Sequence, residues 1–468
     1  MNITNYNWVW LSLLLVSLAS AGSVFAQTTD SGKTETTTEL SEAEKKQQEA
    51  SADVRDAVHE NLSTLHEDID AANQQEARLE EIETGTETSR QEAEQQLTEE
   101  AEPKSFWTRF LSIPEYLQSV PDRLPWIRER GLIFFGRFEF DGAYYSSGIL
   151  SSDSGFRVRS LRAGLAKAYK HNISIKAEID LTDGDNNFTD LYARYHHKRF
   201  GVFTVGNQRV AQTLVNQTSR ISRTFMEEPL PAEAFGLGRR LALGWDTHLR
   251  KAGVHVTLFG PDLNGSIGDY GYASRIYLNP TRSRFSVFHI GGSFVSENMS
   301  RRTRFFSHPE SRVTSARLVD TGLFDNVSNQ HIYGLEVAGA KNSLMFRSEF
   351  FRATWNQEDS KDPLFKGFYA QVSWILTGES FKYTNGKFLR IRPQNPGGAW
   401  EAAVRISKLD LNDNAVTGGE ERNLTLALNW YSSGNQFRLM SNLIFVRTDD
   451  NAGNEDPTII QLRAQLHW

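Results

Sequence analysis

The chain has 468 residues, of which 39% are hydrophobic, 11% aromatic and 23% charged, and it has no cysteine. The lack of cysteine excludes disulfides, thiolate catalysis and Cys-based metal sites. The net charge of −7 hides an uneven distribution. Residues 27–103 contain 22 Asp and Glu against 6 Lys and Arg (net −16), and residues 104–468 contain 36 acidic and 45 basic residues (net +9). A basic body favours nucleic acid, anionic lipid or small anions as partners.

Residues 1–26 are typical of a secretory signal peptide. An apolar core spans residues 8–19, and Val24-Phe25-Ala26 provides small residues for cleavage after Ala26, although no Lys or Arg precedes the core. Export argues against nucleic acid as a partner. No later stretch is apolar over the roughly 18 residues that a membrane helix needs, so a membrane location would require strands.

Residues 27–103 form an acidic arm. Residues 27–61 are rich in Thr, Glu, Ser and Gln, which predicts disorder. A heptad-like run follows, and it supports either a periplasmic coiled coil that helps trimerise the protein or a solvated, partly helical spacer. Its positions are Leu62, Leu65, Ile69, Ala72, Glu76 and Leu79.

Residues 104–130 are predicted to be a linker with an amphipathic segment, interrupted by Pro114 and Pro121. This segment would lie at the membrane interface, cap a barrel mouth, or simply connect the two regions.

From residue 131 onward the chain consists of short segments in which apolar and polar residues alternate. The final segment has Ile460, Leu462, Ala464, Leu466 and Trp468 on one face, and Gln461, Arg463, Gln465 and His467 on the other. A transmembrane barrel requires this pattern, with lipid outside, water inside and no unpaired backbone in the bilayer.

The predicted fold is therefore all-β, a 16-stranded antiparallel transmembrane β-barrel over residues 131–468, preceded by the acidic arm. The sixteen predicted strands are 131–145, 155–168, 172–182, 188–198, 200–208, 240–249, 252–260, 269–278, 282–295, 330–340, 342–355, 364–376, 398–412, 420–431, 435–448 and 457–468.

The lengths of the connections favour the outer membrane of a Gram-negative bacterium, with the N-terminal arm in the periplasm. In this orientation the odd connections face outward, and they include the two longest, residues 209–239 and 296–329. The even connections are mostly tight turns, except residues 377–397. Long outer loops and short periplasmic turns are typical of outer-membrane barrels.

Three motifs carry a resemblance to a known family. Residues 367–379 (GFYAQVSWILTGE) lead to Gly397-Gly398-Ala399-Trp400-Glu401. The second motif comprises Thr218-Ser219-Arg220, Phe225-Met226-Glu227 and Arg239-Arg240, and the third comprises Phe156-Arg157-Val158-Arg159 with Glu178, Asp180 and Asp190. Over residues 131–468 the chain resembles the phosphate-selective porin O and P family.

This resemblance implies a trimeric barrel with a third outer loop folded inward and an anion-binding constriction. Two positions depart from the family pattern. Glu228 stands where the family tends to have a basic residue, and Ser160 follows Arg159 where the family tends to pair arginines. Both departures weaken the expectation of phosphate specificity but not that of a porin.

Anion selectivity needs cationic groups at the narrowest part of a water-filled pore. Arginine suits phosphate because its planar fork makes paired hydrogen bonds and keeps its charge. Alternation places Lys176 inward together with Glu178 and Asp180, and Arg159 and Arg162 can both point inward only if a bulge separates them. The predicted constriction residues are Arg159, Arg162, Lys176, Arg220, Arg223, Arg239 and Arg240.

Such charges could instead merely solvate the lumen and pair with acids. The fifth outer loop adds five more arginines, which would form a basic funnel if the loop folds inward or contact anionic surface sugars if it stays outside. They are Arg301, Arg302, Arg304, Arg312 and Arg317.

The favoured function is passive diffusion of small anions, with phosphate or polyphosphate as candidates, through a homotrimer embedded in outer-membrane lipid. The alternative is a general porin, or one for carboxylates or sugars, without phosphate specificity. We expect no enzymatic activity, cofactor or metal, because no nucleotide-binding loop or Gly-x-Ser-x-Gly motif is present. An adhesin anchored by a barrel is disfavoured because the arm precedes the barrel. We also expect Trp468 to be recognised by the barrel-assembly machinery.

Overall fold

The computed structural model describes residues 131–146, 153–182, 187–263, 269–283, 285–299, 303–357, 362–413, 416–449 and 456–468. The predicted signal peptide, acidic arm and linker (1–26, 27–103 and 104–130) lie outside these residues. Within the described part of the chain, no helix has the length and hydropathy needed to cross a bilayer.

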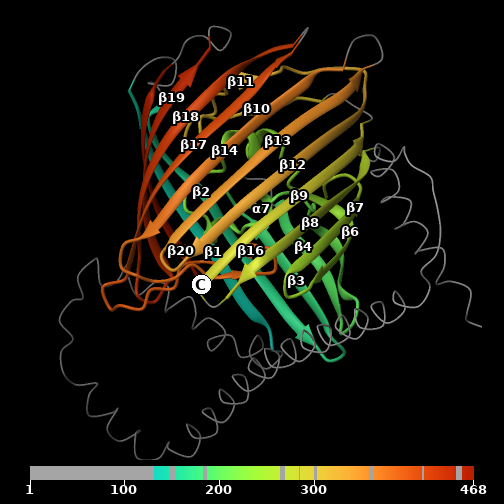
Figure 1. Cartoon of the computed structure of the whole chain (residues 1–468), viewed down its shortest axis with the longest axis vertical. Helices are drawn as coiled ribbons and strands as arrows, with labels where there is room; N and C mark the ends of the chain where they lie inside the picture. The colour runs from blue at the N-terminus through green and yellow to red at the C-terminus, as the bar shows by residue number, and fades with distance from the viewer. Residues whose placement is uncertain are drawn as a thin grey trace, which may run out of the picture. The chain divides into compact units, whose positions relative to one another are not determined.

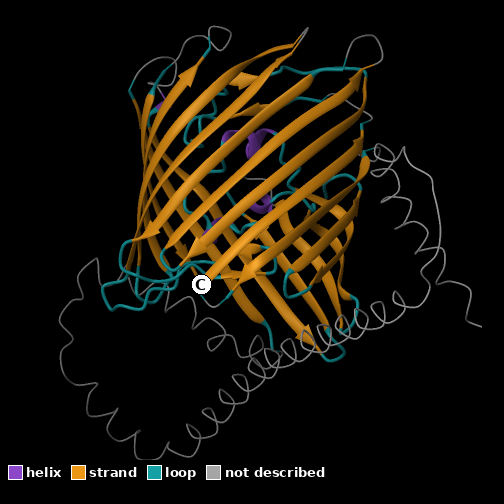
Figure 2. Ribbon diagram, viewed as in Figure 1, coloured by secondary structure: helices purple, strands orange, loops and turns teal. Residues whose placement is uncertain are grey.

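The chain folds into a closed barrel of sixteen antiparallel strands in sequence order, and β20 closes the barrel against β1 (Figure 1, Figure 2). The strands are β1 (Ile133–Tyr145), β2 (Gly155–Tyr169), β3 (Ile173–Asp180), β4 (Asn187–His197), β5 (Gly201–Arg209), β6 (Arg239–His248), β7 (Ala252–Phe259), β8 (Tyr270–Arg282), β9 (Ser286–Asn298), β12 (Val327–Lys341), β13 (Leu344–Gln357), β14 (Leu364–Ile375), β17 (Ala399–Asp413), β18 (Val416–Tyr431), β19 (Phe437–Thr448) and β20 (Thr458–His467).

The prediction of sixteen strands is confirmed, and most strand ends lie within three residues of their predicted positions. The larger differences occur at hairpins. β8 continues to Arg282 because Thr281 pairs with Phe288 and Arg282 with Val287. β9 therefore begins at Ser286 rather than at residue 282. β18 begins at Val416 rather than at residue 420, because Thr417 and Val416 extend its pairing with β17.

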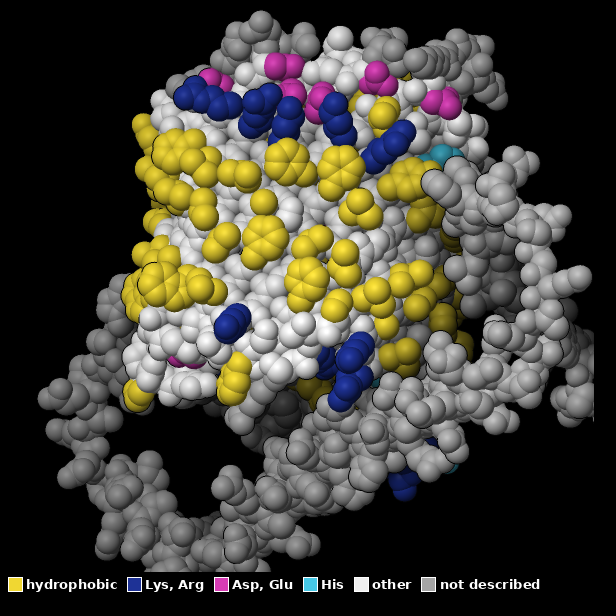
Figure 3. All heavy atoms as spheres, in the orientation of Figure 1, with side chains coloured by type: hydrophobic (Ala, Val, Ile, Leu, Met, Phe, Trp, Pro, Cys, Tyr) yellow, Lys and Arg dark blue, Asp and Glu magenta, His cyan; other side chains and the backbone are white. Residues whose placement is uncertain are grey.

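Alternation along each strand separates an apolar outer face from a polar lumen. In β20, Ile460 and Leu462 are 49% and 60% exposed, whereas Gln461 and Arg463 are 0% and 1% exposed. Figure 3 shows the result on one face of the barrel, where hydrophobic side chains form a broad band over the strands. Exposed apolar residues on a barrel wall match a lipid environment, in which the backbone groups pair between strands.

Strand length divides the barrel into two sides. β12, β13, β17 and β18 have 15, 14, 15 and 16 residues, whereas β3, β5 and β7 have 8, 9 and 8. We call the wall from β12 to β19 the tall wall and the wall from β3 to β7 the low wall. Two short ladders lie in connections, β10 (Phe306–Ser307) with β11 (Val319–Asp320) and β15 (Tyr383–Thr384) with β16 (Lys387–Phe388).

Candidate anion constriction

The connection between β5 and β6, residues 210–238, folds into the lumen and is called loop 3 below. It contains the short helices α7 (Leu214–Gln217) and α8 (Leu230–Ala234) and the 3-10 turn η2 (Arg220–Ser222), and Figure 2 shows helices inside the barrel. The large apolar residues of loop 3 would be exposed to water if the loop extended outside the barrel. In the structure, Leu214, Phe225 and Phe235 are at most 1% exposed. The inward fold implied by the family resemblance is therefore present.

One side of loop 3 is fixed to the tall wall. The free N–H groups of Leu214 and Val215, in the first turn of α7, donate to carboxylate oxygens of Glu336 (2.5 Å) and Glu349 (2.9 Å). Where loop 3 comes closest to the tall wall, the wall residues are glycines, Gly334 and Gly367. A Cβ on Gly334 would lie 2.3 Å from Thr213 Cγ2, and one on Gly367 would lie 2.6 Å from Pro231 Cβ.

Three buried arginines hold the next part of loop 3 by its backbone carbonyls. Arg438 donates to the carbonyl oxygens of residues 223 and 224 (2.7 and 3.1 Å). Arg463 donates to the carbonyl of residue 226 (2.6 Å), and Arg405 donates to that of residue 227 (3.1 Å). Arg438 lies on β19, Arg463 on β20 and Arg405 on β17. Loop 3 therefore reaches from the tall wall to β20, the strand that closes the barrel against β1.

Two further segments fill the tall-wall side of the lumen. In the connection between β9 and β12, here called loop 5, the Glu310 carboxylate accepts hydrogen bonds from Arg405 (2.5 Å), Ser407 (2.6 Å) and Thr425 (2.7 Å). From the other end, Phe381, Phe388 and Ile391 of the turn between β14 and β17 pack in one cluster with Leu214 and Tyr431. Two cavities lie on the other side of loop 3, toward β1 to β6.

Both cavities on this open side of the lumen are lined by Arg137 and Arg162. One has a volume of about 220 Å³ and is bordered by loop 3 and by Arg312 of loop 5. The other has a volume of about 380 Å³ and is bordered by Arg390, by the short turn at residues 434–436 and by Trp468. Because loops 3 and 5 emerge at the opposite end of the barrel from that turn, the cavities follow each other along the barrel axis.

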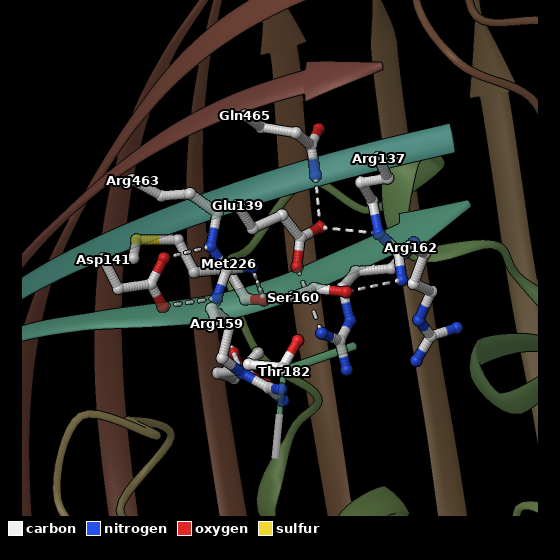
Figure 4. Close-up of polar contacts among 12 residues, drawn as sticks. Arg137, Glu139, Asp141, Arg159, Ser160, Arg162, Thr182, Met226, Arg463 and Gln465 are labelled. Atoms are coloured by element: carbon white, nitrogen blue, oxygen red, sulfur yellow. Dashed lines mark hydrogen bonds and ion pairs between the residues drawn. The ribbon is translucent and has the colours of Figure 1, made fainter. Parts of the chain in front are cut away.

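Arg159 and Arg162 both point into the lumen, and a bulge makes this possible. The β1–β2 register shifts at this point, because Glu139 pairs with Ser160 and the next residue, Phe140, pairs with Val158. Arg159 makes a bidentate pair with Glu227 (2.8 and 3.0 Å), and Arg162 contacts Asp180 (2.7 Å) and Glu178 (3.0 Å). Figure 4 shows how the polar side chains of β1, β2 and β20 converge at this wall.

The other predicted residues also lie here, except Arg240. Lys176 contacts Asp190 (2.7 Å), which Arg239 also contacts (2.5 Å). Arg220 contacts Glu139 (3.1 Å), and Arg223 pairs with Glu228. Arg240 lines neither cavity and donates to the carbonyls of residues 237 and 239, with Glu297 at 3.8 Å. The structure thus brings six of the seven predicted residues together.

The cavity beside loop 3 has a surplus of positive charge. Eight arginines line it against three glutamates, Glu227, Glu228 and Glu233. Burial alone would favour the neutral acid, but Arg159 and Arg463 hold the pKa of Glu227 well below its usual range, so that it stays ionised. Arg209 donates only to the carbonyls of residues 216 and 218 and has no carboxylate partner among the described residues. The lining thus carries more cations than carboxylates, while Asp180, Glu139 and Asp190 contact three of these arginines from outside the lining.

Loop 5 folds inward, and its three described arginines, Arg304, Arg312 and Arg317, are paired with carboxylates rather than arranged as a broad funnel. Arg304 and Arg317 both pair with Asp320 of the same loop. Arg312 lines the smaller cavity and contacts Glu233 (2.6 Å). Arg301 and Arg302 lie outside the described residues. Within the described ranges, no group of side chains could hold a metal ion.

The first of the three sequence motifs, residues 367–379 with residues 397–401, forms the frame of the long turn between β14 and β17. Thr377 hydroxyl accepts the Trp400 N–H (3.2 Å) and donates to Glu379, whose other oxygen accepts the N–H of Gln394 (3.1 Å). Gly398 has φ of +85°, and a Cβ there would lie 2.1 Å from the Tyr431 carbonyl. The motif therefore closes a turn that fills one side of the lumen.

The model of the family described as "Phosphate-selective porin O and P" matches residues 134–468, which is more than half of the chain. The chain belongs to this family. The match includes every strand of the barrel, and family and fold together identify an outer-membrane barrel of the porin type rather than an enzyme.

Two curated proteins and one solved structure illustrate the relationship. An uncharacterized protein of Caulobacter vibrioides is 28% identical over 297 residues, covering 59% of this chain and 60% of that protein. The chain thus matches less than two thirds of the length of this relative. Porin O of Pseudomonas aeruginosa is 23% identical over 366 residues, covering 68% of the chain described here and 82% of Porin O.

The solved structure is a loop-deletion mutant of OmpT, an outer membrane protein of Vibrio cholerae. It has a TM-score of 0.50 at 12% identity and covers 72% of this chain and 99% of that chain. At this identity the similarity concerns the fold alone.

The sequence prediction missed several cavity residues of this porin. Arg137 lines both cavities, and it follows the same alternation as Glu139 and Asp141, so period-2 counting along β1 would have found it. Arg209 and Arg390 line one cavity each. The position of Arg390 depends on how the long turn folds back. Arg209 is the last residue of β5, and the alternation is interrupted before it at Gly206, which has φ of +125°.

Proposed function

We propose that this porin allows passive diffusion of small anions through the two successive cavities. The observation that carries this proposal is the lining of the smaller cavity, in which eight arginines face three glutamates. Arginines that border hydrated space raise the local concentration of anions and keep their charge at every physiological pH. Conduction also requires that each site bind the ion weakly enough to release it, and an arginine already paired with a carboxylate binds a passing anion only weakly.

Phosphate and polyphosphate remain the candidate solutes, but we propose only a modest preference for phosphate. Many of the guanidinium groups are already engaged: Arg159 by Glu227, Arg162 by Asp180, and Arg223 by Glu228. Each engaged group offers fewer donors to a passing phosphate, whereas chloride responds mainly to the field. This observation also keeps the alternative open, a general or carboxylate-type porin without phosphate specificity.

We further propose that the porin is a homotrimer in outer-membrane lipid, with the arm in the periplasm. Support for an interface on the low wall comes from an apolar groove of about 360 Å³ across β3 to β6, lined by residues such as Ile173, Phe203 and Leu243. Size-exclusion chromatography with light scattering on the full chain, and gels of unboiled samples, test this assembly. A monomer under all mild detergent conditions would contradict it.

A planar-bilayer recording tests the transport proposal. We expect a reversal potential that shows anion preference in a chloride gradient, and a reduction of chloride current when phosphate is added. The control is the same channel with a neutral sugar of similar size in place of phosphate. A channel that prefers cations would contradict the proposal, and one that responds equally to phosphate and sugar would favour the alternative.

A further inference from the structure

A row of basic side chains runs along the outer face of the tall wall, close to the end of the barrel from which loops 3 and 5 emerge. Figure 3 shows Lys and Arg side chains in a row directly beside the hydrophobic band. The residues next to the row in the strands, such as Phe351, Phe365 and Glu421, are at most 1% exposed and point into the barrel. Because successive side chains in a strand alternate, the row itself faces outward. The basic row consists of Arg352, Lys366, Lys408, Arg422 and Arg447, on β13, β14, β17, β18 and β19.

A second row, which is apolar, lies beside the basic row on the same five strands. Each of its members is two residues from a basic residue, on the side away from the loops, so the period of two places both on the same face. All five are large and between 38% and 48% exposed. The apolar row consists of Phe350, Phe368, Ile406, Leu424 and Phe445.

The basic row places like charges directly opposite one another. The strand register pairs Arg352 with Lys366, Lys408 with Arg422, and Arg422 with Arg447. Such pairs destabilise a sheet unless an anion lies between them. Asp410, Glu420 and Asp456 provide three carboxylates for the five cations. Arg352 has no ion-pair partner within the residues that the structure describes.

The cations are also more exposed on the outer face than the carboxylates that they contact. The side chains of Lys366 and Arg422 are 60% and 63% exposed, whereas those of Asp410 and Glu420 are 17% and 19% exposed. A large anionic group that approaches from outside therefore meets the cations first.

We propose that the two rows form a binding surface for a phosphorylated lipid of the outer leaflet. The phosphate groups bind the basic row, and the acyl chains lie along the apolar row. Five adjacent strands, about 4.8 Å apart, give a surface roughly 20 Å wide, which suits a lipid with several acyl chains and more than one phosphate. Arginine favours this choice because its fork matches the phosphate oxygens.

This inference rests on the proposed placement in the outer membrane, but it concerns a surface outside the lumen. Charge argues against a second copy of the chain as the occupant, because a twofold contact through this surface would place one basic row against another.

The test measures lipid binding by the refolded full-length porin in neutral detergent, using native mass spectrometry. The probes are bisphosphorylated lipid A and the same lipid after removal of its phosphates. The test variant is Arg352→Gln/Lys366→Gln/Arg422→Gln. The matched control, Lys170→Gln/Lys198→Gln/Lys251→Gln, removes the same charge from exposed turns at the other end of the barrel.

We expect the wild type and the control to bind the phosphorylated lipid alike, and the test variant to bind it about tenfold more weakly or worse. Equal binding of the two lipids by the wild type would overturn the inference, as would an equal loss in the control variant. Since the chain has no cysteine, Arg352→Cys gives a further readout. Efficient disulfide cross-linking between barrels in native membranes would show that a second copy covers this surface.

Planar-bilayer conductance of the same variants separates this inference from the transport proposal. Because the basic row lies outside the lumen, its substitution should leave the reversal potential unchanged. Loss of lipid binding with normal anion selectivity in the variant supports the inference. Absence of anion selectivity in the wild type would count against the transport proposal alone.

Discussion

The two sides of the lumen use the same residue types for different purposes. On the tall-wall side, Arg275 and Glu336 form a bidentate pair, with side chains only 2% and 0% exposed, and this pair supports loop 3 and the long turn. On the open side, the side chains of Arg159, Arg220 and Arg239 are 16% to 21% exposed and border the cavities. Burial makes an ion pair part of the framework, whereas contact with water leaves part of its charge available to solutes.

The largest effect is expected from breaking the buried pair. Glu336→Ala leaves Arg275 without its carboxylate and removes the acceptor for the Leu214 N–H. Loss of one partner of a buried pair typically lowers the free energy of unfolding by about 3–5 kcal/mol. Urea unfolding of the barrel in lipid vesicles, followed by tryptophan fluorescence, measures this loss.

The matched control on the open side is Arg220→Ala. Its carboxylate partner, Glu139, also has Arg137 (3.4 Å) and Gln465 (2.6 Å) beside it, so the loss of stability should be clearly smaller. Equal destabilisation by the two substitutions would mean that the two sides do not differ as argued.

The second effect concerns the fit of loop 3 against the tall wall. In Gly334→Ala the new Cβ would lie 2.3 Å from Thr213 Cγ2, so loop 3 must shift away from β12. Overpacking of this kind costs about 1–3 kcal/mol. We expect altered single-channel conductance together with weaker anion selectivity, measured in planar bilayers. Gly339→Ala on the same strand is the control, because its Cβ would have no neighbour closer than 3.5 Å. Identical behaviour of the two variants would refute the role of Gly334.

The third effect concerns charge on the open side. Arg220→Ala/Arg223→Ala removes two cations from the lining of the smaller cavity, so the reversal potential should move toward cation preference. Arg240→Ala is a matched control, since Arg240 was predicted as a constriction residue but lines neither cavity. A shift of equal size in the control would show that selectivity arises elsewhere.

The barrel could be predicted from the sequence because alternation is a local property. The two faces of β20 and the inward position of Lys176 both follow from counting residues in steps of two. Arg159 and Arg162 are three residues apart and would face opposite sides of a regular strand. The sequence therefore predicts that both can face the lumen only if a bulge separates them, and the bulge is present.

The filling of the lumen could not be predicted in the same way. Arg438 donates to residue 223, which is 215 positions away, and Glu310 accepts from Thr425. Contacts of this kind depend on three segments, far apart in the sequence, that fold back into the lumen and pack against one another, and no periodicity encodes them. The same reason applies to Arg240. Its side chain binds the backbone at the end of loop 3 and lies near Glu297, and neither contact follows from a local pattern.

The smallest effect, and the one most specific for phosphate, is expected at Glu228. In the wild type Glu228 pairs with Arg223 on the lining of the smaller cavity. Glu228→Arg frees the Arg223 guanidinium and changes the local charge by two units. A hydrogen bond to a charged group contributes roughly 1.5–3 kcal/mol, so one newly available donor should lower the phosphate concentration that blocks half of the chloride current by about tenfold. Glu228→Gln should give an intermediate shift, since it frees Arg223 without adding a cation. Chloride conductance without phosphate should change much less, because chloride responds to the field rather than to the number of donors. If phosphate block is the same in all three channels, the arginines of loop 3 have a structural role and the pore serves another solute.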